Sequence, residues 1–269
     1  MKQTQFLILV ILLFSLARAT ASCQETTNFT FPNGAKAAIC LTYDDGLPSH
    51  VNTVGPALAK HALKGTFFIT LSSSSVQEDM DKWRALAAAG HELANHSVYH
   101  PCRKSLPGMD WVRDYYDLDH YTVEQVLAEI RVANGFLQAL DGRKKRTYAY
   151  PCAHIFAGGV NFKDSIAQVA TAARGVHDLL VPPNEIDLMN VASWAPSGVT
   201  GEELIAYVQT VIEKQTLGTF CFHGIGAEYL TVSAAAHEML LQWLESHQKE
   251  VWVTTFGEAT DYLRKAAVK

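Results

Sequence analysis

The sequence has 269 residues, of which 48% are hydrophobic and 18% are charged, and this balance predicts one globular domain with a sizeable core. The formal net charge is -5 with the 11 histidines neutral, and the basic residues are scattered rather than gathered into runs. These features exclude nucleic acid as an expected partner, and nothing in the sequence implies a protein partner.

The first residues have the pattern of an export signal. Lys2 precedes an apolar stretch over residues 6–16, and small residues follow at Ala19 and Ala21. We expect a signal peptide over 1–21 and an exported protein that is secreted, periplasmic or in the cell envelope. The stretch is short for a membrane anchor. A lipoprotein modified at Cys23 is an alternative, which Thr20 disfavours because such signals usually carry Leu there.

After an N-terminal extension over 22–35, apolar runs alternate with amphipathic segments, and no Pro-, Gly- or Ser-rich linker divides them. The predicted strands cover 37–42, 65–70, 92–95, 147–150, 176–180, 219–222 and 251–254. The predicted helices cover 49–61, 78–89, 123–140, 164–173, 201–214, 233–247 and 257–265. A capping box of Thr122 and Gln125 begins the clearest of these helices.

Strict alternation of strand and helix predicts a parallel sheet with crossover helices. The number of repeats favours an α/β fold, a distorted (β/α)7-8 barrel that forms a single domain over 36–265. An open doubly wound sheet is the competing architecture. Residues 101–121 break the alternation and predict a long loop, whose aromatic side chains at Trp111, Tyr115 and Tyr116 cover the barrel mouth or stack on the rings of a bound ligand.

Two adjacent carboxylates, Asp44 and Asp45, come directly after the first predicted strand. The carboxyl ends of parallel strands form the catalytic end of a barrel, and neighbouring side chains diverge there. One carboxylate can therefore bind a metal while the other faces a substrate. In isolation, Asp-Asp-Gly at 44–46 is more often a solvated turn.

Histidines follow two other predicted strands. His96 and His100 can converge on one cation, with an Asp as the third protein ligand and a coordination position left for water. His223 ends the apolar run 219–222 and can serve as a proton donor. Alone, each would be interpreted as a capping, surface or buried core histidine.

In chain order these motifs resemble those of the polysaccharide deacetylase superfamily, also called the NodB homology domain or carbohydrate esterase family four. The resemblance covers roughly residues 37–260. It rests on TYDDG at 42–46, HSVYH at 96–100, a degenerate YPC at 150–152, a segment ending at Trp194, and FCFH ending at His223.

The resemblance implies a hydrolase that uses a divalent metal, expected to be Zn2+, to remove N- or O-linked acetyl groups from an acetylated glycan. Asp45, His96 and His100 would be the metal ligands. Asp44 would be the base and His223 the acid, and the backbone N–H of Cys152 would stabilise the oxyanion. The implied substrate-binding residues are Tyr150, Pro151, Trp194 and Phe222.

The sequence departs from the family pattern at two positions. Ala149 stands where family members carry an Arg that orients the base, and Arg143, Arg146 or no residue substitutes for it. Ser193 stands where an Asp tunes the catalytic His, and Asp187 is a candidate replacement. These departures are the argument for an alternative function, a carbohydrate-binding pseudoenzyme that keeps the metal site without turnover.

Four cysteines remain once Cys23 is set aside with the processed end: Cys40, Cys102, Cys152 and Cys221. Export permits disulfides. Cys102 and Cys152 each lie beside a motif of the expected site, so a bridge between them is a hypothesis. The alternative is that all four are small buried thiols.

Overall fold

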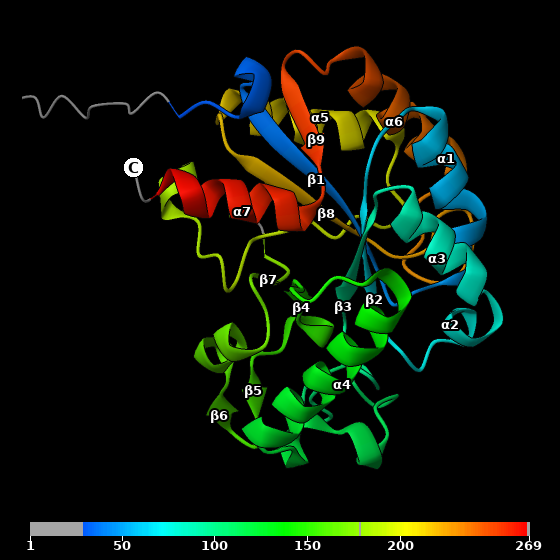
Figure 1. The fold of residues 1–269 in the computed structure, drawn as a ribbon, viewed down its shortest axis with the longest axis vertical. Helices are drawn as coiled ribbons and strands as arrows, with labels where there is room; N and C mark the ends of the chain where they lie inside the picture. The colour runs from blue at the N-terminus through cyan, green and yellow to red at the C-terminus, as the bar shows by residue number, and fades with distance from the viewer. Residues whose placement is uncertain (1–28, 178, 268–269) are drawn as a thin grey trace, which may run out of the picture.

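The computed structural model describes residues 29–177 and 179–267 (Figure 1). The predicted signal peptide and residues 22–28 of the expected extension lie outside the described residues. Within the described residues, none of the helices combines the length and the hydrophobicity that crossing a bilayer requires.

The main sheet has seven strands in the order β7-β4-β3-β2-β1-β8, with β9 also paired to β1. Every pairing in it is parallel. β1 is central, because its residues pair with β8, β9 and β2. The strands are β1 (Ala37–Asp44), β2 (Thr66–Ile69), β3 (Glu92–Asn95), β4 (Tyr148–Ala149), β7 (Ala173–Arg174), β8 (Leu217–Phe222) and β9 (Val251–Thr254).

The sheet closes through residues 191–194, which we call the closing segment. Val191 forms an isolated parallel bridge with Arg174 of β7, and Trp194 forms one with Phe220 of β8. The prediction of a distorted barrel in a single domain is therefore confirmed. A separate two-stranded hairpin, β5 (Phe156–Ala157) and β6 (Val160–Asn161), lies beside it.

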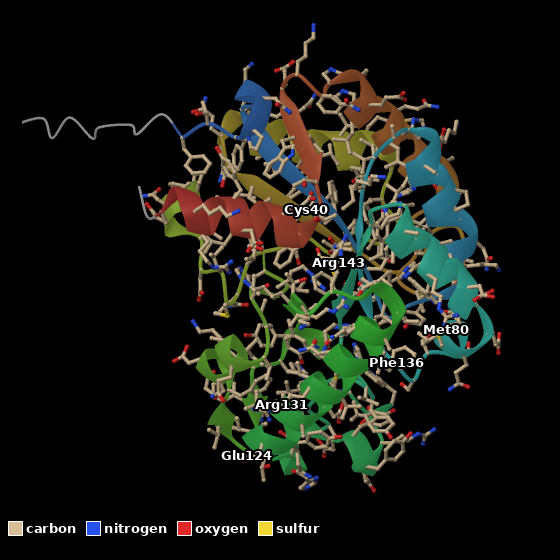
Figure 2. The ribbon with its side chains drawn as sticks, in the orientation of Figure 1. Cys40, Met80, Glu124, Arg131, Phe136 and Arg143 are labelled. Atoms are coloured by element: carbon tan, nitrogen blue, oxygen red, sulfur yellow. A yellow bond between two sulfur atoms is a disulfide. The ribbon has the colours of Figure 1, made fainter. Side chains whose placement is uncertain are left out.

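The helices cover the outside of the sheet, with α4 along β2 to β4 and α7 across β1, β8 and β9 in the view of Figure 1. Thr122 and Gln125 form the predicted capping box of α4, and Gly142 ends that helix at a φ of 73°. Arg143 follows that end (Figure 2). The helices are α1 (Gly55–Lys60), α2 (Ser74–Glu78), α3 (Met80–Ala88), α4 (Val123–Asp141), α5 (Gly201–Glu213), α6 (Ala234–Ser246) and α7 (Phe256–Ala266).

Two predicted elements are wrong. Within the predicted strand 176–180, the described residues form no strand beyond an isolated bridge at His177, since β7 is Ala173–Arg174 and the side chains of Val176 and Leu179 are 40% and 57% exposed. The helix predicted over 164–173 is a 3-10 helix over Lys163–Gln168. It ends there because Ala173, at the end of the predicted range, belongs to β7 and pairs with β4. Burial of Ala173 in the barrel outweighs the helical propensity of alanine.

Aromatic side chains pack between the end of β1 and the helices that cover the sheet. Tyr43, directly before Asp44, stacks on Phe67 and Phe222 with ring centroids 5.2 and 5.5 Å apart. Its hydroxyl lies 2.9 Å from Nε2 of the buried His237. Close packing of these rings fixes the end of β1, and with it the backbone from which the two carboxylates project.

Candidate metal centre and active site

The predicted chemistry-bearing residues meet at the carboxyl edge of the sheet. Asp44 ends β1, His96 follows β3, and His223 follows β8. They line one cavity of about 1100 Å³, together with Asp45, His100 and Cys152. Segments that are far apart in the sequence thus surround a single space, as the barrel topology predicts.

Asp45, His96 and His100 form a compact cluster in which the possible ligand atoms lie within 4.8 Å of one another. Oδ1 of Asp45 lies 3.4 Å from Nε2 of His96 and 3.3 Å from Nε2 of His100. Two imidazole nitrogens and one carboxylate oxygen are a common protein donor set for a divalent transition metal.

The surroundings of the cluster fit a cation. Oδ1 of Asp45 is buried and has no hydrogen-bond partner among the described residues, whereas Oδ2 accepts a hydrogen bond from Tyr229 at 2.8 Å. Nδ1 of His96 lies 2.9 Å from the carbonyl of Ala149, so it carries the proton and leaves the Nε2 lone pair for a metal. Burial lowers the pKa of His100 to about 4, which keeps that ring neutral and able to ligate.

The loop that carries the histidines is strained and firmly held. Ser97 and His100 have φ values of 69° and 57°, which non-glycine residues rarely adopt. Oδ1 of Asn95 accepts from the N–H of Ser97 at 2.7 Å, and Oγ of Ser97 accepts from the N–H of His100 at 2.9 Å. Oε2 of Glu129, on α4, accepts from two further backbone N–H groups of the loop at 3.2 Å each.

Asp44 has a different environment from Asp45. Its Oδ2 forms a close ion pair with Nη2 of Arg174 and accepts from Sγ of Cys221 at 3.3 Å. Its Oδ1 is buried without a hydrogen-bond partner in the described part of the chain. Burial alone would raise the pKa of Asp44, but the charges of Arg174, His96 and His223 lower it, so this carboxyl is ionised at neutral pH.

His223 lies on the other side of the cluster from β3. Its Nε2 is 3.9 Å from Oδ2 of Asp45, and its side chain is 15% exposed. The backbone carbonyl of His223 accepts from Nε2 of the buried His50 at 3.0 Å, which fixes the end of β8. The imidazole is therefore positioned beside the carboxylates and remains accessible from the cavity.

Cys152 and Cys102 are joined by a disulfide with a Cα–Cα distance of 5.9 Å. The bridge ties the loop after β4 to the loop after β3, and Sγ of Cys102 lies 3.5 Å from Nδ1 of His100. Cys152 has a φ of 53°, and among the described residues its backbone N–H donates no hydrogen bond. Cys40 and Cys221 are buried free thiols.

The predicted substrate-binding residues have different positions. Tyr150 lines the cavity, and the buried Pro151 does not. For Phe222 the prediction is wrong, because its side chain is 0% exposed within the core. Trp194 also lies outside this cavity and packs against Tyr207 and Phe220. Besides Tyr150, the tyrosine and tryptophan side chains that line the cavity are those of Tyr99, Trp111, Tyr115, Tyr116 and Tyr229.

The three residues that were predicted to replace the missing Arg and Asp lie away from the cluster. Arg146 pairs with Asp141 at 2.6 Å, before β4 rather than after it, and Arg143 is exposed. Asp187 pairs with Lys163 at 2.7 Å, with half of its side chain exposed. None of the three contacts the cluster, so the predictions that they substitute there are wrong. Sequence reasoning missed Arg174 and Tyr229.

The chain is similar to known proteins in sequence and in fold. The family model for polysaccharide deacetylase matches residues 32–171. The chain is 24% identical over 251 residues to a gellan lyase from Bacillus sp, covering 84% of this chain and 9% of that protein. It is 39% identical over 64 residues to a chitooligosaccharide deacetylase from Rhizobium leguminosarum bv. trifolii, covering 23% of this chain and 29% of that protein. The chain thus spans less than a third of the length of either relative.

Among solved structures, the fold is similar to that of a Mycobacterium smegmatis protein described as a polysaccharide deacetylase. The TM-score is 0.63 at 16% identity, over 88% of this chain and 93% of that chain. This likeness concerns the fold. The family model covers more than half of the sequence, including the motifs around Asp44 and His96, and so the chain belongs to the polysaccharide deacetylase family.

Proposed function

We propose that the protein is a metal-dependent hydrolase that removes acetyl groups from a polysaccharide or oligosaccharide. The proposal rests mainly on the hydrogen bonding of the two adjacent carboxylates, which is the same for both. Asp44 and Asp45 each have one oxygen held by a neighbouring side chain and one buried oxygen without a protein partner in the described chain. Such oxygens are costly to bury unless a cation, a water or a substrate completes them.

Asp45, His96 and His100 would hold the divalent cation, for which we propose Zn2+. When bound, it supplies Lewis acidity, which lowers the pKa of water and polarises the acetyl carbonyl. Tyr229 keeps Oδ2 of Asp45 occupied, so Oδ1 is the oxygen available to the cation.

The remaining residues move protons and stabilise charge. Oδ1 of Asp44 accepts a proton from the attacking water, because Oδ2 is already engaged by Arg174 and Cys221. The N–H of Cys152 donates to the oxygen that becomes negative in the tetrahedral intermediate. His223 then gives a proton to the departing amine or alcohol and is reprotonated by the proton that Asp44 took from the water, so one water and one acetylated sugar yield acetic acid and the free amino or hydroxyl group.

The pseudoenzyme alternative loses one of its two arguments. It was based on Ala149 and Ser193, but Arg174 provides the guanidinium that Ala149 lacks. Ser193 remains a departure, because in the described part of the chain its hydroxyl contacts Arg174 and Gly175 rather than His223. The comparisons give the alternative no advantage over the hydrolase.

Acetate release from chitin oligomers, peptidoglycan and acetylated xylan tests the proposal. We expect wild-type protein to release acetate from at least one of them, to lose this activity with a chelator, and to recover it when Zn2+ is restored. Asp44→Asn is the matched control and should bind the metal without turnover. Unchanged release after complete metal removal would sink the metal-dependent mechanism, and glycan binding without release would favour the pseudoenzyme.

We also propose that the protein is exported after cleavage near Ser22, on the basis of the N-terminal sequence pattern. Mass spectrometry of the mature N-terminus from cell fractions checks this. A chain that still carries residues 1–21 would contradict it.

A further inference from the structure

The strand next to β4 carries a buried arginine, Arg174. β4 and β7 are paired in parallel, and Ala149 of β4 is the register partner of Arg174 of β7. The two residues are therefore at the same height of the barrel wall, one strand apart, which is about 4.8 Å in a sheet. An arginine side chain is long enough to span that offset, so Arg174 can reach the carboxylate that an arginine at 149 would contact.

Arg174 is itself tightly held. Its side chain is 1% exposed, and its Nη1 donates to Oγ of Ser193 at 3.0 Å. Ser193 in turn donates to the carbonyl of Gly175 at 2.6 Å, and the guanidinium lies over the ring of Phe68 at 5.1 Å from its centroid. One arm of the guanidinium is thus fixed by the closing segment while the other pairs with Asp44.

The arrangement is poorly explained by stability. A buried ion pair gains little over apolar packing of the same volume. Nε of Arg174 is also buried without an acceptor among the described residues, which adds a desolvation cost. A costly group retained beside a reactive carboxylate points to a role in the chemistry.

We infer that Arg174 is the positioning residue for Asp44: it holds Oδ2 from the neighbouring strand and so directs Oδ1 toward the reacting water, with Ser193 as its support. This inference rests on the proposed function for its effect on turnover. The inference also gives Ser193 a role, although the family carries Asp at this position, because the hydroxyl of Ser193 accepts a hydrogen bond from the guanidinium of Arg174.

Four variants test the inference. Arg174→Ala removes the contact, Arg174→Lys keeps a buried charge and therefore the fold, and Ala149→Arg combined with Arg174→Ala moves the guanidinium back to β4. Arg146→Ala is the matched control, because Arg146 is also buried and paired with a carboxylate, that of Asp141, outside the site. The measurements are kcat and KM for acetate release, bound zinc per chain, thermal unfolding, and a crystal structure of each Arg174 variant.

We expect Arg174→Ala to lower kcat about 100-fold, which is within the usual contribution of a general base, while KM and zinc content stay close to wild type. Arg174→Lys should lower kcat about tenfold, because one ammonium cannot hold Asp44 and Ser193 together. The relocated arginine should recover about tenfold over Arg174→Ala. Arg146→Ala should lower the unfolding temperature and leave kcat unchanged.

Wild-type kcat in Arg174→Lys or in a folded Arg174→Ala variant would overturn the inference. So would a crystal structure in which the Asp44 carboxylate keeps its orientation without Arg174. The crystal structures decide the positioning role even if wild-type protein releases no acetate, an outcome that would count against the proposed function instead.

Discussion

The hydroxyl of Tyr229 donates to Oδ2 of Asp45 at 2.8 Å, and this bond leaves Oδ1 facing the Nε2 atoms of His96 and His100. The tyrosine belongs to the loop after β8, whereas Asp45 directly follows β1. One contact therefore joins two distant segments and sets which carboxylate oxygen is available to a cation.

Tyr229→Phe should weaken zinc affinity about tenfold, because second-shell partners of metal ligands contribute about 10–100-fold. Competition with a chromophoric chelator measures this. Tyr115→Phe is the control, since Tyr115 also lines the cavity but its side chain is 70% exposed, and the hydroxyl that donates to Oδ2 of Asp45 is that of Tyr229. Equal affinity in the two variants would contradict an orienting role for Tyr229.

Glu129→Ala should also weaken zinc binding, because it leaves the N–H groups of Val98 and Tyr99 without their acceptor and loosens the loop that carries His100. We expect a loss of at least about tenfold in affinity. Glu124→Ala, an exposed change on the same helix (Figure 2), should leave it unchanged. Hydrogen exchange of the loop amides gives an independent measurement, and exchange as slow as in wild type would argue against the effect.

Replacing both Cys102 and Cys152 by Ala should lower the free energy of unfolding by about 2–4 kcal/mol, the usual contribution of a disulfide that closes a loop of this size. Denaturant titration of wild type and variant, each with and without reductant, measures the difference. Reductant should destabilise only the wild type. If it destabilises both equally, the bridge is not the source of the effect.

Stability should fall as the pH falls from 6.5 to 4. Burial lowers the pKa of His50 and of His237 to about 4, so both rings stay neutral in the folded protein, whereas the unfolded chain protonates them near their ordinary value of 6.5. The unfolded state binds more protons in this window, and each ring contributes a slope of about 1.4 kcal/mol per pH unit. Unfolding free energies at several pH values check this. A slope that His237→Gln leaves unchanged would exclude that residue as a contributor.

The long, strongly patterned elements could be predicted from the sequence. β1 and α4 combine apolar runs or faces with clear boundaries, and the motifs at Asp44, His96 and His223 follow strands whose ends must meet. The two-residue strand β7 could not be predicted, because it is too short to show a period and the more apolar residues 176–180 competed for the same place. Arg174 was missed with it.

Other contacts depend on tertiary structure that no local pattern encodes. Tyr229 reaches Asp45 across 184 positions of sequence. Phe222 sits in the same motif as His223 but points into the core, because successive residues of a strand alternate between its two faces. That alternation was a signal available in the sequence, and it could have removed Phe222 from the predicted substrate contacts.

The closing segment affects where the barrel wall opens transiently. Among the described residues, Val191 exchanges two backbone hydrogen bonds with the β7 side, Trp194 exchanges two with β8, and Ser193 forms an isolated bridge with His177, whereas β1 and β8 share six register pairs. Transient opening of the wall therefore needs fewer broken bonds at this seam than between β1 and β8. Ser193 and Arg174 lie at the seam, and Arg174 pairs with Asp44, so a thermal fluctuation of the seam would act on the carboxylate that we propose as the proton acceptor.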